Sequence, residues 1–182
     1  MENMITWFFK VANFRSIISM CIIYLIFPLY LLPKIINTGS TGTPPLDLLF
    51  WYNHDTLYQM MTNYGEAARN KYIIGLLTVD IVYPIFYGTL LAMIMALIIK
   101  KLPITFPKKI IFIPYIVVVF DLIENSGLVF LLSTYPTRHN VIADIVGFVT
   151  ATKWSVFVIT VMFIIYAIVY GILIRKRKIH NQ

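Results

Sequence analysis

The stretch that decides the fold is Phe120–Gly127, FDLIENSG, inside a run that is otherwise apolar from Ile110 to Leu132. Its two carboxylates and its carboxamide are Asp121, Glu124 and Asn125, whose spacing of three and four residues places them on one face of a helix. A charged side chain at bilayer depth costs on the order of a few kcal/mol, so such residues usually face a protein interior or a wet cavity. The stretch therefore predicts a membrane helix that turns two carboxylates and a carboxamide toward a protected site.

The composition is typical of an integral membrane protein. Of the 182 residues, 59% are hydrophobic and only 13% are charged, and the mean hydropathy is +0.80, far from the averages of soluble domains. The net charge of +7 could suggest nucleic acid, but the basic residues flank apolar runs, as membrane topology requires, so no nucleic-acid partner is expected. With Cys21 as the only cysteine, an intrachain disulfide and a thiolate zinc site are excluded.

The apolar runs predict an all-α, polytopic membrane protein with one domain over residues 1–182 and four transmembrane helices in an antiparallel bundle. The expected spans are 16–35, 72–99, 110–133 and 152–174. Residues 1–15 resemble an amphipathic, interfacial lead-in. The first run could also be read as a signal peptide, but no small-x-small cleavage site follows and Pro28 and Pro33 interrupt its end, which favours an uncleaved span.

Two connections shape this bundle. The first, over residues 36–71, is the only long one, and it is expected to form an interfacial helix or a lid. Within it, Asn53 or Asp55 can cap a short helix that ends at Gly65. The run 141–174 is too long for one straight crossing, so residues 141–153 are expected to form an outer extension or an interfacial turn.

The basic residues predict the orientation. With both termini in the cytoplasm, ten Lys and Arg side chains fall on the cytoplasmic side and five on the outer side. Such a bias over short flanking segments sets orientation. We therefore expect a multi-pass protein of the plasma membrane with cytoplasmic N- and C-termini.

A third acid joins the two in FDLIENSG. Asp80, Tyr83 and Tyr87 are spaced i, i+3, i+7 in the second span and share one face. Asp80 lies about 12 Å below the outer end of its helix, and Asp121 and Glu124 lie about 17 and 21 Å above the inner end of theirs. In a hydrocarbon core of ~30 Å, all three acids fall in the outer half.

Three carboxylates cannot all be charged in a dry pocket unless cations accompany them. The expected cations are Arg69 and Lys153 at the outer ends of their spans. Otherwise, one acid is protonated at pH 7 or holds a bound cation. The predicted ligand-binding residues are Asp80, Asp121, Glu124, Asn125, Tyr83, Tyr87, Arg69 and Lys153. The alternative is that these polar residues only tie helices together.

No metal site or cofactor is predicted. The three histidines, His54, His139 and His180, lie in loops or at ends and share no helix face, and the chain has no phosphate-binding, dinucleotide-binding or hydrolase motif.

Three functions from different classes are consistent with these patterns. The first is a polar pocket that binds a cation, a proton or a lipid-like, amphiphilic ligand, associated with transport. Membrane lipids are then the expected partners, and a homo-oligomer or a larger membrane complex is expected because four spans are few for an independent transporter.

The second is an intramembrane enzyme with Glu124 or Asp121 as general acid/base on a lipid or isoprenoid substrate, although no second catalytic element is identifiable. The third is an accessory or immunity-type subunit that uses residues 37–71 as its contact surface.

Overall fold

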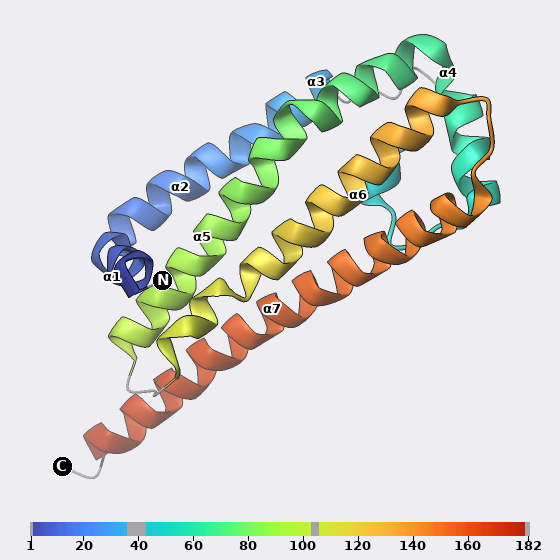
Figure 1. Cartoon of the computed structure of the whole chain (residues 1–182). Helices are drawn as coiled ribbons and strands as arrows, with labels where there is room; N and C mark the ends of the chain where they lie inside the picture. The colour runs from blue at the N-terminus through green and yellow to red at the C-terminus, as the bar shows by residue number, and fades with distance from the viewer. Residues whose placement is uncertain (1, 36–42, 103–105, 181–182) are drawn as a thin grey trace.

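The chain forms a long bundle of helices (Figure 1). The computed structural model describes residues 2–35, 43–102 and 106–180, and these residues form helices and loops without a strand. The elements are α1 (Glu2–Val11), α2 (Phe14–Ile26), the π-helical turn η1 (Phe27–Leu31), α3 (Leu32–Ile35), the 3₁₀ turn η2 (Leu46–Leu48), α4 (His54–Leu77), α5 (Val79–Lys101), the 3₁₀ turn η3 (Lys108–Phe112), α6 (Pro114–Thr134) and α7 (Asn140–His180).

Four helical segments are long and apolar enough to cross a membrane. They are Phe14–Leu31, Val79–Lys101, Lys108–Thr134 and Asn140–Arg175. The predicted all-α, membrane-embedded class with four spans is therefore confirmed. Of the predicted outer connection, residues 36–42 lie outside the described part of the chain.

Helix α6 lies between α5 and α7 (Figure 1) and packs against both. It begins at Pro114, because proline is favoured at the first helical position, where its missing N–H is not needed. It ends at Thr134, two residues before Pro136, because a proline disfavours helical backbone in the residue that precedes it. FDLIENSG thus lies in the middle of the bundle rather than on its edge.

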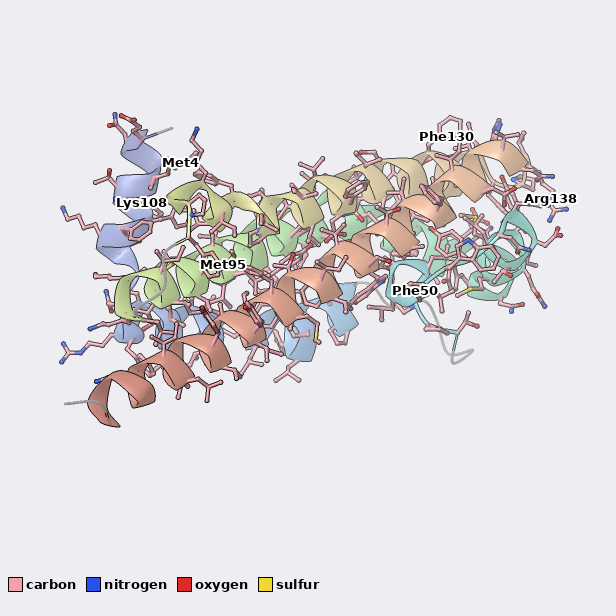
Figure 2. The ribbon with its side chains drawn as sticks, turned by 90° about the horizontal axis from the view of Figure 1, so that it is seen from below. Met4, Phe50, Met95, Lys108, Phe130 and Arg138 are labelled. Atoms are coloured by element: carbon pink, nitrogen blue, oxygen red, sulfur yellow. The ribbon has the colours of Figure 1, made fainter. Side chains whose placement is uncertain are left out.

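The end of the molecule that carries α1 is closed by apolar packing. Helix α1 crosses the ends of the long helices (Figure 2), and its buried Ile5 and Phe8 join a cluster that includes Met93 of α5 and Ile111 of η3. The Lys100 side chain donates a hydrogen bond to the main-chain oxygen of Phe9 at 3.2 Å. By contrast, α2 contacts α5 without burying any of its own residues, so it is a peripheral helix.

The opposite end is formed by residues 43–77. Asn53 caps α4 by accepting a hydrogen bond from the Thr56 N–H at 2.9 Å, one of the two predicted caps. Gly65 does not end the helix as predicted: it adopts φ 74° and ψ 166° and bends α4, which then continues to Leu77. Only glycine enters this region of φ without a steric cost. A second break at Thr78 makes the span begin at Val79, later than the predicted residue 72.

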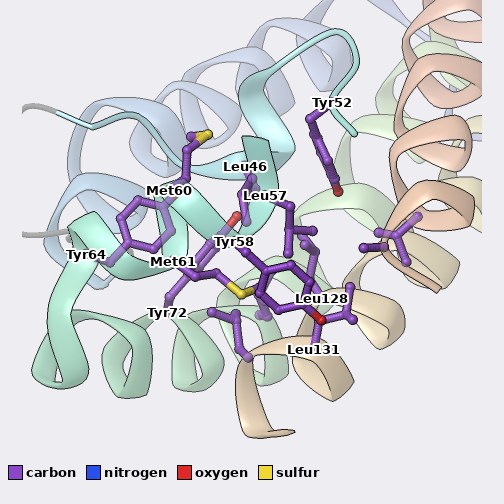
Figure 3. Close-up of a cluster of buried hydrophobic side chains, with 14 of the residues drawn as sticks. Leu46, Tyr52, Leu57, Tyr58, Met60, Met61, Tyr64, Tyr72, Leu128 and Leu131 are labelled. Carbon is purple, nitrogen blue, oxygen red and sulfur yellow. The ribbon is translucent and has the colours of Figure 1, made fainter. Parts of the chain in front are cut away.

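A buried cluster attaches this segment to the long helices. Leu46, Tyr52, Leu57, Met61 and Tyr72 come from residues 43–77 (Figure 3), and they pack with leucines of α6 and with Ala143 and Val146 of α7. Burying large apolar and aromatic side chains stabilises such contacts by roughly 1.5–3 kcal/mol each. Residues 43–77 are therefore an integral part of the fold.

Helix α7 decides between the two alternatives predicted for residues 141–153. They form no interfacial turn but the first part of one helix, Asn140–His180, which leaves the outer extension as a prediction. The run contains no proline to break it. Its apolar part of 36 residues would measure roughly 54 Å, well beyond the ~30 Å core, and its C-terminal end projects beyond α5 (Figure 1).

Gly147 generates a prediction about the joint between α7 and residues 43–77. A Cβ atom at Gly147 would clash with the main-chain carbonyl oxygen of Tyr52, whereas one at Gly88 would clash only with a side-chain methyl group, Cγ2 of Val118. We expect Gly147→Ala to lower the free energy of unfolding by about 1–3 kcal/mol. The matched control, Gly88→Ala, should lower it by at least about 1 kcal/mol less, because a side chain moves more easily than the main chain. Unfolding in mixed micelles measures both, and equal effects would contradict this packing.

Candidate functional site

A cavity of about 500 Å³ lies among the helices that carry the buried acids. Its polar wall is formed by side chains of η2, α5, α6 and α7, namely Asp47, Asp80, Tyr83, Tyr87, Asp121 and Lys153. Its apolar wall comes largely from residues on α2, η1, α3 and η2, among them Pro28, Leu32, Pro33 and Leu48. The volume falls in the range of small-molecule sites, about 300–1,000 Å³. The cavity is therefore amphiphilic and large enough for a ligand.

A proline explains how α5 and α6 meet at this cavity. Pro84 lies inside α5 and has no N–H, so the carbonyl oxygen of Asp80, four residues earlier, loses its helical partner. The side-chain amide of Asn125 on α6 donates a hydrogen bond to that oxygen at 2.9 Å. Asn125 thus satisfies the main chain of α5 and brings α6 beside Asp80.

Lys153 of α7 is the cation beside the two acids of α6. Its Nζ atom lies 2.5 Å from Glu124 Oε2 and 3.4 Å from Asp121 Oδ1, and it donates to the main-chain oxygen of Asp47 at 3.3 Å. Glu124 is completely buried, and Asp121 and Lys153 are 6% exposed. Lys153 is the one buried cation among the described residues, so a single ammonium group serves both carboxyl groups.

Neutral hydroxyl groups complete this ionic cluster. Tyr87 donates to Asp121 Oδ2 at 2.8 Å, and Thr150 donates to Glu124 Oε1 at 2.6 Å. The Thr150 hydroxyl also lies 3.2 Å from that of Tyr52. Thr150 and Lys153 are three residues apart on α7 and therefore face the same way. Each carboxylate oxygen of Asp121 and Glu124 thus has a hydroxyl or an ammonium partner.

Asp80 is the exception. It lines the cavity and is 4% exposed, yet its Oδ2 atom has no hydrogen-bond partner among the described residues, and neither does Asn125 Oδ1. Buried polar atoms are normally paired, and leaving one unpaired costs about 1–3 kcal/mol. Two buried acceptors at one helix crossing are therefore free to accept a hydrogen bond.

Sequence reasoning missed Asp47, which connects η2 to the cavity. Tyr72 donates a hydrogen bond to Asp47 Oδ1. Burial and the negative charge of Asp47 raise the pKa of the Tyr72 hydroxyl, so it remains protonated and able to donate. The Trp154 indole donates to the main-chain oxygen of Asp47 at 3.3 Å. The signal was available, because Asp47 is a single acid within an apolar stretch, as Asp121 and Glu124 are.

The structure brings together seven of the eight predicted site residues and leaves Arg69 elsewhere. Tyr83, half-buried, lies at the cavity with its hydroxyl 2.9 Å from that of Tyr24 on α2. Arg69 donates to the main-chain oxygen of Met61 at 2.8 Å and stacks on Tyr135 at 4.1 Å. The bend at Gly65 and the break at Thr78 separate it from the acids, so Lys153 is the only one of the two predicted cations that contacts them.

Across the part of the chain that the structure describes, no three His, Cys, Asp or Glu side chains are arranged to hold a metal ion. The groups at the cavity are carboxylates, phenols and one ammonium. Such groups can bind a polar headgroup and hold or accept protons.

The bond between Asn125 and Asp80 generates a prediction that involves Pro84. Asn125→Leu removes the donor to the Asp80 carbonyl and should lower the free energy of unfolding by about 1–3 kcal/mol. In a Pro84→Ala background, the substituted alanine has a main-chain N–H that can bond this carbonyl, so the cost of Asn125→Leu should become smaller. Unfolding in mixed micelles measures the difference. Ser126→Ala, which removes a hydroxyl bonded within α6, is the control, and an equal cost in both backgrounds would contradict this role.

The comparisons with known proteins leave the site as the only guide to function. No family model, no curated protein and no solved structure matches the chain. Any function assigned to it therefore rests on the cavity and its buried side chains.

Proposed function

We propose that the protein binds a lipid-like or amphiphilic ligand in the cavity between α2–α3 and the bundle of α5, α6 and α7. The observation that carries the proposal is the cavity itself, which joins an apolar wall to a polar wall with a buried, unpaired carboxylate oxygen on Asp80. Polar residues that only tied helices together would satisfy one another. Asp121 and Glu124 are satisfied in this way, whereas Asp80 is not.

The membrane arrangement completes this proposal. The four spans cross the plasma membrane as an antiparallel bundle, with both termini in the cytoplasm. In support, α1 and the C-terminal end of α7 lie at the same end of the molecule (Figure 1), and the basic residues favour that end by ten to five. Residues 43–77 then lie on the outer side and act as a lid, with η2 over the cavity.

The position of Leu48 indicates how a ligand enters. Leu48 lines the cavity and is also 59% exposed, so the cavity reaches the molecular surface beside η2. Its apolar wall includes peripheral elements around α2, which bury little of their own surface. An amphiphile from the outer leaflet can therefore enter at this edge. Membrane lipids are the proposed source of the ligand, and assembly into an oligomer or a larger complex would link binding to transport.

Native mass spectrometry of the full chain, purified in a mild detergent and incubated with a total membrane lipid extract, tests the proposal. We expect a bound molecule on the wild type and a loss of at least about fivefold in occupancy for Leu48→Trp, because the indole would block the cavity mouth. Phe50→Trp is the matched control, since Phe50 is 61% exposed in the same segment but does not line the cavity. A wild-type chain that carries nothing would refute the proposal.

A further inference from the structure

The headgroup chemistry of the ligand can be argued from the unpaired atoms, on the basis of the proposed function. Lys153 already has partners, because Glu124 Oε2, Asp121 Oδ1 and the Asp47 carbonyl oxygen lie within 3.4 Å of its Nζ atom. An anionic headgroup such as a phosphate or a carboxylate would therefore meet acidic side chains without a free cation. The cavity disfavours anionic ligands.

The atoms left without partners are both acceptors. Asp80 Oδ2 faces no donor, and Asn125 Oδ1 has none because the amide nitrogen of Asn125 is held by the Asp80 carbonyl. A ligand that completes this site must supply hydrogen-bond donors. A protonated amine has three donors, no acceptor and a positive charge. An alcohol supplies one donor and no charge.

An aromatic row beside Asp80 also favours a cation. Tyr24 stacks on Tyr83 with ring centroids 5.6 Å apart, Tyr83 meets Tyr87 edge to face at 5.5 Å, and Tyr87 meets Phe157 at 6.2 Å. All four side chains line the cavity. Aromatic faces attract ammonium groups, more strongly where water is excluded. The polar wall thus combines a carboxylate with aromatic rings.

We infer that the ligand is an amphiphile with a protonated amine, whose ammonium group pairs with the Asp80 carboxylate while its alkyl part lies on the wall formed by Pro28, Leu32 and Pro33. The Asp80 charge, which Lys153 does not contact, then has its own counterion. Lys153 acts as a fixed internal cation that holds Asp121 and Glu124 and leaves Asp80 to the ligand.

The experiment compares dodecylamine with 1-dodecanol, which has the same tail, and with dodecanoate. Each probe is titrated into the full chain in a neutral detergent, and the apparent Kd is taken from native mass spectrometry. We expect the wild type to bind dodecylamine at least about tenfold more tightly than dodecanol, because charge-assisted hydrogen bonds are stronger than neutral ones. Dodecanoate should bind least.

The variant Asp80→Asn should abolish this preference, because it should weaken dodecylamine binding by at least about tenfold and dodecanol binding by less. Asp55→Asn is the matched control, since its side chain is 70% exposed and does not line the cavity, so it should retain the preference. If the wild type binds dodecylamine and dodecanol equally, or prefers dodecanoate, the amine assignment is overturned while binding in the cavity stands. If no probe binds, the proposed function fails as well. The wild-type comparison decides the assignment even if Asp80→Asn does not fold.

Discussion

The ion pairs of Lys153 with Glu124 and Asp121 are the interaction on which the arrangement of the bundle depends. They join α6 to α7 within the apolar part of the chain, where an unpaired charge is costly. Lys153 also bonds the main chain of Asp47, so the same ammonium group holds η2 over the cavity. Because three acceptors already lie within 3.4 Å of this ammonium group, it is poorly placed to bind a further ligand. What remains open is the neighbouring acid on α5.

The second constraint comes from Pro84. Pro84 has no N–H, so one main-chain carbonyl oxygen of α5 lacks its helical hydrogen bond, and the Asn125 amide on α6 donates to that oxygen instead. This contact places Asp80 beside the acids of α6 but leaves the Asp80 carboxylate itself without a partner. The two constraints thus divide the three acids into a pair that shares the Lys153 cation and a single open carboxylate. That division gives the cavity a polar end suited to a cationic headgroup.

Much of this fold could be predicted from the sequence. Hydropathy identified four helices apolar enough to cross a membrane, and the i, i+3, i+4 spacing in FDLIENSG placed Asp121, Glu124 and Asn125 on one buried face. The bend at Gly65 and the continuity of α7 could not be predicted in this way. A glycine with positive φ can either end or bend a helix, and only packing decides which. The length of α7 likewise depends on tertiary contacts. Thr150, a polar residue of the segment 141–153, forms hydrogen bonds with Glu124 and Tyr52 inside the bundle.

The site was predicted less completely than the fold. The acids, the tyrosines and Lys153 were recognised because polar residues in apolar runs stand out. Arg69 was misplaced, since its proximity was inferred from a straight second span that in fact begins at Val79. The role of Asn125 could not be predicted from the sequence, because its partner is a main-chain group, the carbonyl oxygen of Asp80. That oxygen is available because Pro84, four residues after Asp80, has no N–H to bond it. Such pairings across helices become clear only when both helices are in place.

A double-mutant cycle on Lys153 and Glu124, measured by unfolding in mixed micelles, tests the central claim most directly. Lys153→Met should lower the free energy of unfolding by about 3–5 kcal/mol, because it leaves buried carboxylates without a cation. Adding Glu124→Gln should restore at least about 1 kcal/mol, because one of those charges is then removed. A Lys153→Met variant as stable as the wild type, or a second substitution that only adds its own cost, would contradict the account.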